Sequence, residues 1–226
     1  MLELFELRGA DPEILFSPYC WRVRLALAHK GLPFTGSPLR FTDKEPLACS
    51  GQNLVPVIRD GETVVNDSVA IFEYLDATYP QQPLLGDSLA ANRARLLEKL
   101  TFTALRMPLL KLLVPRVYAA IDDADKDYFR TSREKALGMT LEAFADRQLG
   151  LDSFVLAVGP LEAWLKTQPY LDGEQPAGTD YLVAGLFFWA WCLGEQPWPA
   201  ESAVDAWFQR ILKRYEAEFG VVKRAA

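Results

Sequence analysis

The chain changes character near residues 80–88, and this change constrains the fold more than any other feature of the sequence. Before it, short β-rich runs alternate with helical segments, whereas the segments after it all have helical periodicity. Residues 80–87 contain two prolines and a glycine, which is typical of a linker. We therefore expect two domains, at residues 1–83 and 88–226.

The first domain has the signals of a mixed α/β unit. Four β-rich runs are expected to be strands: residues 2–7, 34–40, 55–58 and 63–65. A helix is expected from Pro18 to Lys30, ending before Gly31, and a second over residues 69–79. The dipeptide Asp60-Gly61 favours a tight hairpin turn between the last two strands. This order of elements predicts a thioredoxin-like α/β domain.

The second domain is expected to be all-α. Five helical stretches are predicted: residues 88–120, 128–149, 151–167, 179–193 and 202–218. Pro108 and Pro115 are expected to kink or divide the first of them, because proline lacks the amide that a helix interior uses. The fold class predicted is a thioredoxin-like N-terminal domain followed by an all-α C-terminal helical domain.

Charge and hydropathy exclude several functions. The net charge is −6, which gives no support for a nucleic-acid-binding protein, since such proteins need a basic face. No apolar run reaches the ~18 residues of a membrane helix, and residues 181–193 predict a buried core helix instead. We see no signal peptide at the N-terminus, so we expect a cytoplasmic protein with no membrane partner.

Histidine and cysteine usage limits the chemistry further. With one histidine, His29, and three scattered cysteines, we expect no metal site and no disulfide framework. His29 lies ~18 Å along the same predicted helix from Ser17, so it cannot act as a general base for that serine within this segment. We expect His29 to be a solvated or C-terminal helix residue.

The sequence Ser17-Pro18-Tyr19-Cys20 is the first candidate site. Pro18 suits the first helical turn, which places Ser17 at the helix N-terminus beside unpaired amides and the positive end of the dipole. A thiolate brought there would be stabilised by the dipole and by a hydrogen bond from the Ser17 hydroxyl. The simpler interpretation is that Ser17 only caps the helix. Cys20, one turn further in, is expected to be a buried thiol.

Three further pieces are individually weak. If the Val55–Pro56 bond is cis, Val55 can pair with an extended peptide-like ligand; a trans proline at an edge strand is the alternative. Asp67 and Ser68 are either simple helix caps or a clamp for the ammonium and carboxylate of an amino acid. Lys44 is either a solvated charge or a ligand contact.

Together, the order and spacing of these pieces resemble the cytosolic glutathione transferases over nearly the whole chain. The resemblance implies glutathione as co-substrate, no metal, and Ser17 in the catalytic position. It places Val55 and Pro56 at the family's cis-proline, against the cysteinyl backbone of glutathione. It also implies that Asp67 and Ser68 grip the γ-glutamyl group and that Lys44 reaches the glycine carboxylate. The implied glutathione-binding residues are thus Lys44, Val55, Pro56, Asp67 and Ser68.

The segment 17–22, followed by Leu-Ala-His-Lys-Gly and by residues 128–134, is similar to bacterial β-etherase-type and fungal serine-type (FuA-like) transferases, with omega-like features. That resemblance implies a hydrophobic, aromatic electrophile bound near Leu15, Phe16 and residues 107–118, with conjugation or aryl-ether cleavage as the reaction. It also implies a homodimer. A glutathione-dependent thiol reductase using Cys20 and a non-catalytic carrier of aromatic ligands are the alternatives.

Two residues depart from the family pattern. Asp67 is shorter than the glutamate usual at its position, which weakens the expected contact with the glutathione amine, and the second departure lies in the C-terminal domain. The core helix of the C-terminal domain usually begins with a Ser/Thr-x-x-Asp cap, but Ala177 stands three residues before Asp180. Loss of such a cap costs about 1 kcal/mol. Thr179 is expected to serve as the cap instead.

Overall fold

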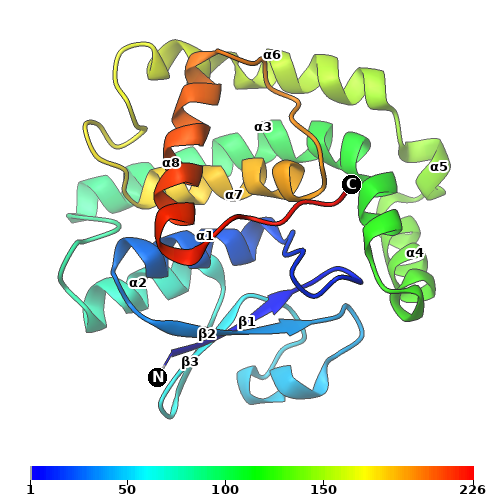
Figure 1. Ribbon diagram of the computed structural model, residues 1–226, viewed down its shortest axis with the longest axis horizontal. Helices are drawn as coiled ribbons and strands as arrows, with labels where there is room; N and C mark the ends of the chain where they lie inside the picture. Colours follow the sequence, from blue (N-terminus) through cyan, green and yellow to red (C-terminus); the bar gives the residue numbers. More distant parts are fainter. Residues whose placement is uncertain (1) are drawn as a thin grey trace.

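The computed structural model describes residues 2–226, in which a small mixed sheet lies below a layered set of helices (Figure 1). The four strands are β1 (Leu2–Leu7), β2 (Phe34–Leu39), β3 (Val57–Asp60) and β4 (Thr63–Asn66). They are arranged in the order β2-β1-β3-β4, with β1 and β2 parallel and the other pairs antiparallel. Asp60 pairs with Thr63, so the predicted turn at Asp60-Gly61 joins β3 to β4.

The two faces of the sheet are covered differently. Helices α1 (Pro18–His29) and α2 (Ser68–Thr78) lie between the sheet and the helical layers, whereas the short 3-10 helix η1 (Glu45–Ser50) lies on the other side (Figure 1). A small apolar cluster of Phe5, Leu47 and Val57 forms under η1. Side chains alternate across a strand, so Leu4 of β1 and Ile58 of β3 point to the opposite face of the sheet and join the main core.

The rest of the chain is helical. The helices are α3 (Ser88–Ala120), α4 (Asp123–Leu137), α5 (Leu141–Phe144), α6 (Arg147–Leu165), α7 (Gly178–Cys192) and α8 (Ala203–Phe219). All but one residue of α7 are buried, as expected for a central helix, and α6 and α8 lie outside it (Figure 1). Within residues 2–226 no helix has the length and apolar character needed to cross a membrane. The fold class predicted from the sequence is confirmed.

Helix α7 packs directly on α1, the helix that begins beside Ser17. A Cβ added to Gly185 of α7 would stand 2.2 Å from the carbonyl oxygen of Pro18. Only glycine permits so close an approach of two backbones. Further along the same contact, the rings of Trp21 and Phe188 stack with centroids 4.3 Å apart. The start of α1 is therefore held by the core of the helical layers.

Several helix predictions were wrong in part. The break expected between residues 149 and 151 lies inside α6, and α4 begins at Asp123 rather than at residue 128. Residues 128–149 do not form one helix, because Gly138 adopts a left-handed conformation (φ 71°) and Thr140 caps the separate helix α5. Glycine at that position satisfies the end of a helix, and an unbroken 3.6-residue periodicity hides it. In α3, Pro108 and Pro115 both lie inside one continuous helix, so neither divides it.

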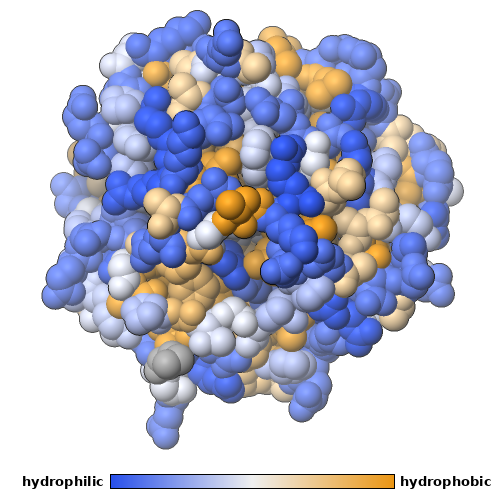
Figure 2. All heavy atoms as spheres, in the orientation of Figure 1, coloured by the Kyte–Doolittle hydropathy of each residue, from blue (hydrophilic) through white to orange (hydrophobic). Residues whose placement is uncertain are grey.

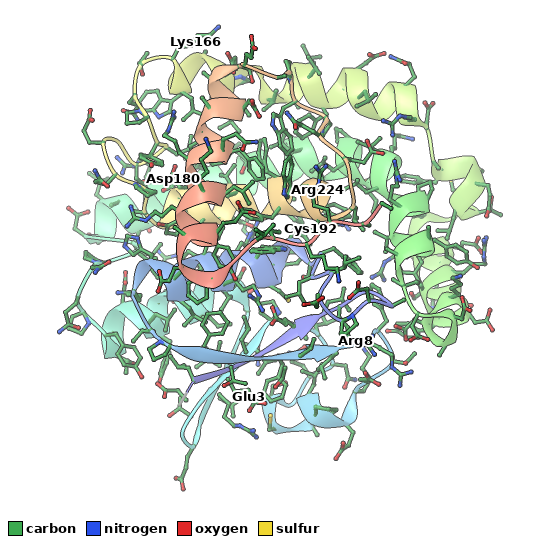
Figure 3. All side chains as sticks on the ribbon, viewed as in Figure 1. Glu3, Arg8, Lys166, Asp180, Cys192 and Arg224 are labelled. Atoms are coloured by element: carbon green, nitrogen blue, oxygen red, sulfur yellow. The ribbon has the colours of Figure 1, made fainter. Side chains whose placement is uncertain are left out.

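The start of α7 also differs from the expectation. Thr179 does not cap the helix, because the helix begins at Gly178 and its N-cap position is Ala177. The backbone amide of Thr179 donates to Asp172 at 2.8 Å. Asp180 takes over much of the role: its carboxylate accepts from the amide of Ala177 at 3.2 Å. The same carboxylate lies between α7 and α8 (Figure 3).

Candidate functional site

A cleft of about 380 Å³ opens between the sheet side and the helical side of the molecule. The start of α1 forms its base, the segments after β2 and before β3 form one wall, and α3 and α4 form the other. The surface view shows a largely hydrophilic face with hydrophobic residues grouped toward its middle (Figure 2). Ser17, Lys44 and Val55 all line the cleft, so three of the predicted site residues meet there.

Ser17 is the N-cap of α1. Its Oγ accepts a hydrogen bond from the backbone amide of Cys20 at 3.3 Å, and only 5% of the residue is exposed. Because Oγ acts as the acceptor in that bond, its hydroxyl hydrogen remains to be donated, and the Cys20 thiol is one group within its reach besides any ligand in the cleft. Ser17 is thus a helix cap that also presents a hydrogen-bond donor at the positive end of the helix dipole.

The other glutathione-site candidates lie beside this cap. The Val55–Pro56 peptide bond is cis, and Val55 lines the cleft while Pro56 is buried. Val57 pairs with Asn66 across β3 and β4, which places Asp67 next to Pro56. Asp67 is exposed and caps α2, accepting from the amides of Val69 and Ala70. Its φ of 70° is uncommon for a residue with a side chain, and such conformations concentrate at ligand sites.

Ser68 is connected to α1 rather than to the cleft itself. It is 2% exposed and its Oγ accepts from Arg22 at 3.3 Å. The same Arg22 nitrogen donates to Glu98 at 3.0 Å, in an ion pair that is buried on both sides. Burial lowers the pKa of Arg22, while the charge of Glu98 opposes that shift. This buried network connects α1, α2 and α3. The sequence did not predict it, because Arg22 and Glu98 are 76 residues apart and no local pattern links them.

Lys44 immediately precedes η1 and lines the cleft beside α4. Its Nζ donates to the carbonyl of Asn53 at 2.9 Å and lies 5.4 Å from the ring centroid of Tyr128. No carboxylate lies within ion-pair distance of Lys44 among residues 2–226. Its charge is therefore free to meet an anion in the cleft.

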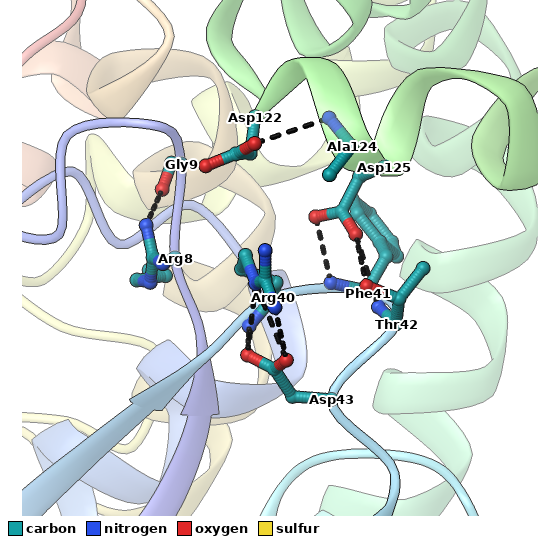
Figure 4. A network of polar contacts seen from close by, with 9 residues as sticks. All are labelled: Arg8, Gly9, Arg40, Phe41, Thr42, Asp43, Asp122, Ala124 and Asp125. Atoms are coloured by element: carbon teal, nitrogen blue, oxygen red, sulfur yellow. Dashed lines mark hydrogen bonds and ion pairs between the residues drawn. The ribbon is translucent and has the colours of Figure 1, made fainter.

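The wall segment after β2 is fastened to α4 by one carboxylate (Figure 4). Asp125 is fully buried and accepts from the amides of Phe41 (3.0 Å) and Thr42 (3.1 Å) and from the Thr42 hydroxyl (2.7 Å). Two residues away, Asp43 binds Arg40 at 2.9 Å. The position of Phe41 in the cleft is thereby fixed from the opposite half of the molecule.

Most of the other residues that line the cleft are aromatic or apolar, and they differ in part from the residues expected. Phe16, Leu110 and Val117 line it as expected, whereas Leu15 and Met107 do not. Sequence reasoning missed the larger aromatic set, which comes from five separate segments: Tyr19, Phe41, Phe102, Tyr128, Phe129 and Trp189. Aromatic residues at helical spacing look the same whether they fill a core or line a cleft, so no local signal distinguishes them.

The cysteines and the histidine stand outside the cleft. Cys20 is 1% exposed, and burial raises the pKa of its thiol to about 12. His29 ends α1 as predicted, but it is packed against Tyr181, whose hydroxyl lies 2.9 Å from Nδ1, rather than solvated. Burial lowers the pKa of His29, so the ring stays neutral at pH 7. In residues 2–226 no cluster of three or more His, Cys, Asp or Glu side chains is arranged to hold a metal ion.

Comparison of the sequence with models of known protein families shows which family the chain belongs to. The model described as glutathione S-transferase, C-terminal domain, matches residues 94–220, more than half of the chain, and the model for the N-terminal domain matches residues 12–83. The chain belongs to the glutathione S-transferase family. The family resemblance inferred from the sequence is confirmed.

Individual relatives agree with the family. A glutathione S-transferase-like protein, ustS, of Aspergillus flavus is 23% identical over 75% of this chain and 72% of its own length. Glutathione transferase GSTFuA3 of Phanerochaete chrysosporium superposes with a TM-score of 0.84 at 22% identity, covering 95% of this chain and 97% of that one. A glutathione S-transferase of Ceriporiopsis subvermispora, solved in complex with glutathione, gives 0.81 at 22% identity, covering 96% of both chains.

Proposed function

We propose that this family member is a glutathione transferase in which Ser17 stabilises the thiolate of bound glutathione. The observation that carries the proposal is the Ser17 hydroxyl, which caps α1 as an acceptor and lies at the base of a cleft with aromatic walls, where it can donate its hydrogen to a ligand. A thiolate there would receive a hydrogen bond and the field of the helix N-terminus, both of which lower a thiol pKa from its ordinary ~8.5.

The neighbouring residues support the placement of glutathione. Val55 and Lys44 line the same cleft as Ser17, and Asp67 and Ser68 follow directly on the strand beside Pro56. An extended tripeptide would run from Ser68 past Val55 to Lys44, with its γ-glutamyl group at α2 and its glycine carboxylate near the Lys44 ammonium. The solved structure with glutathione from Ceriporiopsis subvermispora shares this fold.

The reaction proposed is nucleophilic substitution at an electrophilic carbon of an aromatic substrate. Glutathione's thiol loses its proton to solvent, and the thiolate electron pair forms a carbon–sulfur bond. The bond to the leaving group breaks, and a halide or an aryloxide departs with its electron pair. An aryloxide leaving group corresponds to cleavage of an aryl ether. The chain's own contributions are to stabilise the nucleophile and to position both reactants.

Ser17→Ala tests the proposal. We expect kcat/KM for a glutathione-dependent aryl halide reaction to fall about tenfold or more, because one donor to the thiolate is lost. The pH–rate profile should shift to higher pH, which would show that the thiol pKa has risen. Ser202→Ala is the matched control, since Ser202 caps α8 with a bond from Asp205 at 3.0 Å and lies outside the cleft.

Two results together would overturn it. These are no heat of glutathione binding in titration calorimetry, and turnover by Ser17→Ala equal to that of the unmodified protein on a panel of aryl halides and phenacyl aryl ethers. Reductase chemistry through Cys20 is disfavoured by its burial and raised thiol pKa. Thiol reductase activity that disappears in Cys20→Ser would restore that alternative.

The aromatic lining favours one second candidate, a carrier of aromatic ligands with no chemistry. Such a carrier would bind aromatic compounds tightly yet leave every electrophile in the panel unchanged in the presence of glutathione. Binding titrations and turnover assays on the same compounds separate the two functions.

We also propose that the protein forms the homodimer that the family resemblance implies. Support comes from α3, where Leu89, Leu96 and Leu100 are 77%, 61% and 59% exposed and share one face of the helix. Light scattering should give the mass of two chains, and a mass of one chain would contradict the proposal.

A further inference from the structure

The charges in the cleft oppose the charge of the whole molecule. The chain has a net charge of −6, yet the charged side chains that line the cleft are all basic: Arg40, Lys44, Arg106 and Arg133. Arg40 is neutralised by Asp43. The remaining three have no carboxylate within ion-pair distance among the described residues, so the cleft keeps a local positive charge.

Arg133 is the most constrained of these cations. It extends from α4 into the cleft, and its guanidinium lies 5.6 Å from the ring centroid of Phe41 and 5.2 Å from that of Phe129. Arg130, one turn earlier on the same helix, pairs with Glu134 and Glu142 outside the cleft. Stacking on two rings fixes the Arg133 guanidinium without neutralising it.

Arg106 faces Arg133 from α3 across the same cleft. Its guanidinium lies 5.5 Å from the ring centroid of Phe102, whose ring is 5.7 Å from that of Tyr19. Burial lowers the pKa of Arg133, and the nearby charge of Arg106 acts in the same direction. Arg133 is partly buried and Arg106 is exposed, and their like charges repel one another. An anion bound by both guanidinium groups would relieve that repulsion.

We propose that Arg133 and Arg106 form an anion subsite in the acceptor half of the cleft, and that the electrophile is an aromatic compound carrying a carboxylate. This inference rests on the proposed function for the reaction, but the binding of the carboxylate does not depend on it. Lys44, on the other side of Tyr128, is left for the carboxylate of glutathione.

The shape of the subsite favours an arylcarboxylate over a compact inorganic anion. A guanidinium offers a planar fork that matches a carboxylate in two parallel hydrogen bonds. Around the two forks, Phe41, Phe102 and Phe129 present ring faces and edges to the cleft, which suit a flat apolar body. A small anion would leave these rings exposed to water and would gain nothing from them.

The test uses two unreactive probes, 4-nitrobenzoate and methyl 4-nitrobenzoate, which share the aromatic body and differ in charge and by one methyl group. Each is titrated into the full-length protein with saturating glutathione, and binding is followed by quenching of tryptophan fluorescence, since Trp189 lines the cleft. We expect the carboxylate to bind more tightly than the ester. Arg133→Met and Arg106→Met should each weaken carboxylate binding about tenfold or more and leave ester binding nearly unchanged.

Two controls make the result specific. Arg93→Met removes one positive charge from an exposed residue outside the cleft and should change neither affinity. Arg133→Lys keeps the charge but not the fork and should give an intermediate loss. If Arg133→Met does not fold, Arg106→Met, a change at an exposed residue, carries the test alone.

Equal affinity for the two probes, or equal losses for both probes in the arginine variants, would overturn the proposal. The same holds if Arg93→Met weakens carboxylate binding as much as the cleft variants do. Arginine-dependent binding of the carboxylate without turnover of any arylcarboxylate electrophile supports the subsite and counts against the transferase function alone.

Discussion

Ser17 and Cys20 lie three residues apart on one helix, yet they have opposite environments. Ser17 faces the cleft at the positive end of the helix, whereas Cys20 points into the core and its thiol has a pKa raised to about 12 by burial. A thiol becomes nucleophilic only when it is ionised and accessible. The start of α1 therefore offers no accessible thiol of its own, and the proposed function supplies one from glutathione.

The same contrast predicts how the three cysteines react. Cys49 is exposed, while Cys20 and Cys192 are buried and have raised thiol pKa values. With an aromatic disulfide reagent at pH 8, we expect one thiol per chain to react quickly and all three after unfolding. Cys49→Ser should remove the fast phase. A fast phase that persists in Cys49→Ser would show that a buried cysteine is accessible.

At the scale of the element, α7 begins with a carboxylate in place of a hydroxyl cap. Asp180 is fully buried and accepts from the amide of Leu171 and from Trp207 Nε1, each at 2.7 Å, besides the amides of Asp172 and Ala177. Four donors from three segments converge on one side chain. Although Ala177 has no hydroxyl to cap the helix, the hydrogen bonds of Asp180 hold the start of α7 in place.

Asp180→Ala leaves those four donors without an acceptor in the interior. We expect the free energy of unfolding to fall by about 3 kcal/mol or more, since each unpaired buried donor is costly. Urea denaturation followed by circular dichroism measures this. Asp152→Ala, on the exposed side of α6, is the control and should change stability by less than about 0.5 kcal/mol. A loss below about 1 kcal/mol for Asp180→Ala would contradict the argument.

At the scale of the whole molecule, the site depends on the contact between its two halves. Main-core residues run without interruption from the sheet through α1 to α7 and α8. Asp125 of α4 holds the wall segment at Phe41, and Gly185 of α7 admits the backbone of Pro18, next to Ser17. The cleft is therefore formed by the assembly and belongs to neither half.

Gly185→Ala tests that dependence. The new methyl would meet the Pro18 carbonyl oxygen at 2.2 Å, so α1 and α7 must separate. We expect a loss of about 2 kcal/mol in stability and weaker glutathione binding, measured by urea denaturation and calorimetry.

Gly159→Ala on α6 is the matched control, because nothing lies within 4 Å of its added Cβ. It should leave glutathione binding unchanged and stability unchanged or raised by up to about 1 kcal/mol. Similar behaviour of the two variants would show that the close approach at Gly185 is unimportant.

Much of the fold followed from local sequence signals. The existence of four strands, the Asp60-Gly61 hairpin, the proline at the start of α1 and the full length of α3 were predicted correctly, although β3 runs from Val57 to Asp60 rather than over residues 55–58. The division into domains at 1–83 and 88–226 and the roles of the six site residues remain predictions. Helix boundaries between residues 123 and 151 were predicted wrongly: the end of α4 at Gly138 was missed, and a break was expected inside α6, where apolar periodicity does not mark the ends.

The sequence by itself determined which elements form and where most of them begin and end, because caps, turns and periodicity act over a few residues. Only the tertiary structure decided which side chains meet. It brought Ser17, Lys44 and Val55 to one cleft, buried Cys20, and left Arg106 and Arg133 without a carboxylate. Burial and charge pairing depend on segments far apart in the chain, and no local pattern records them.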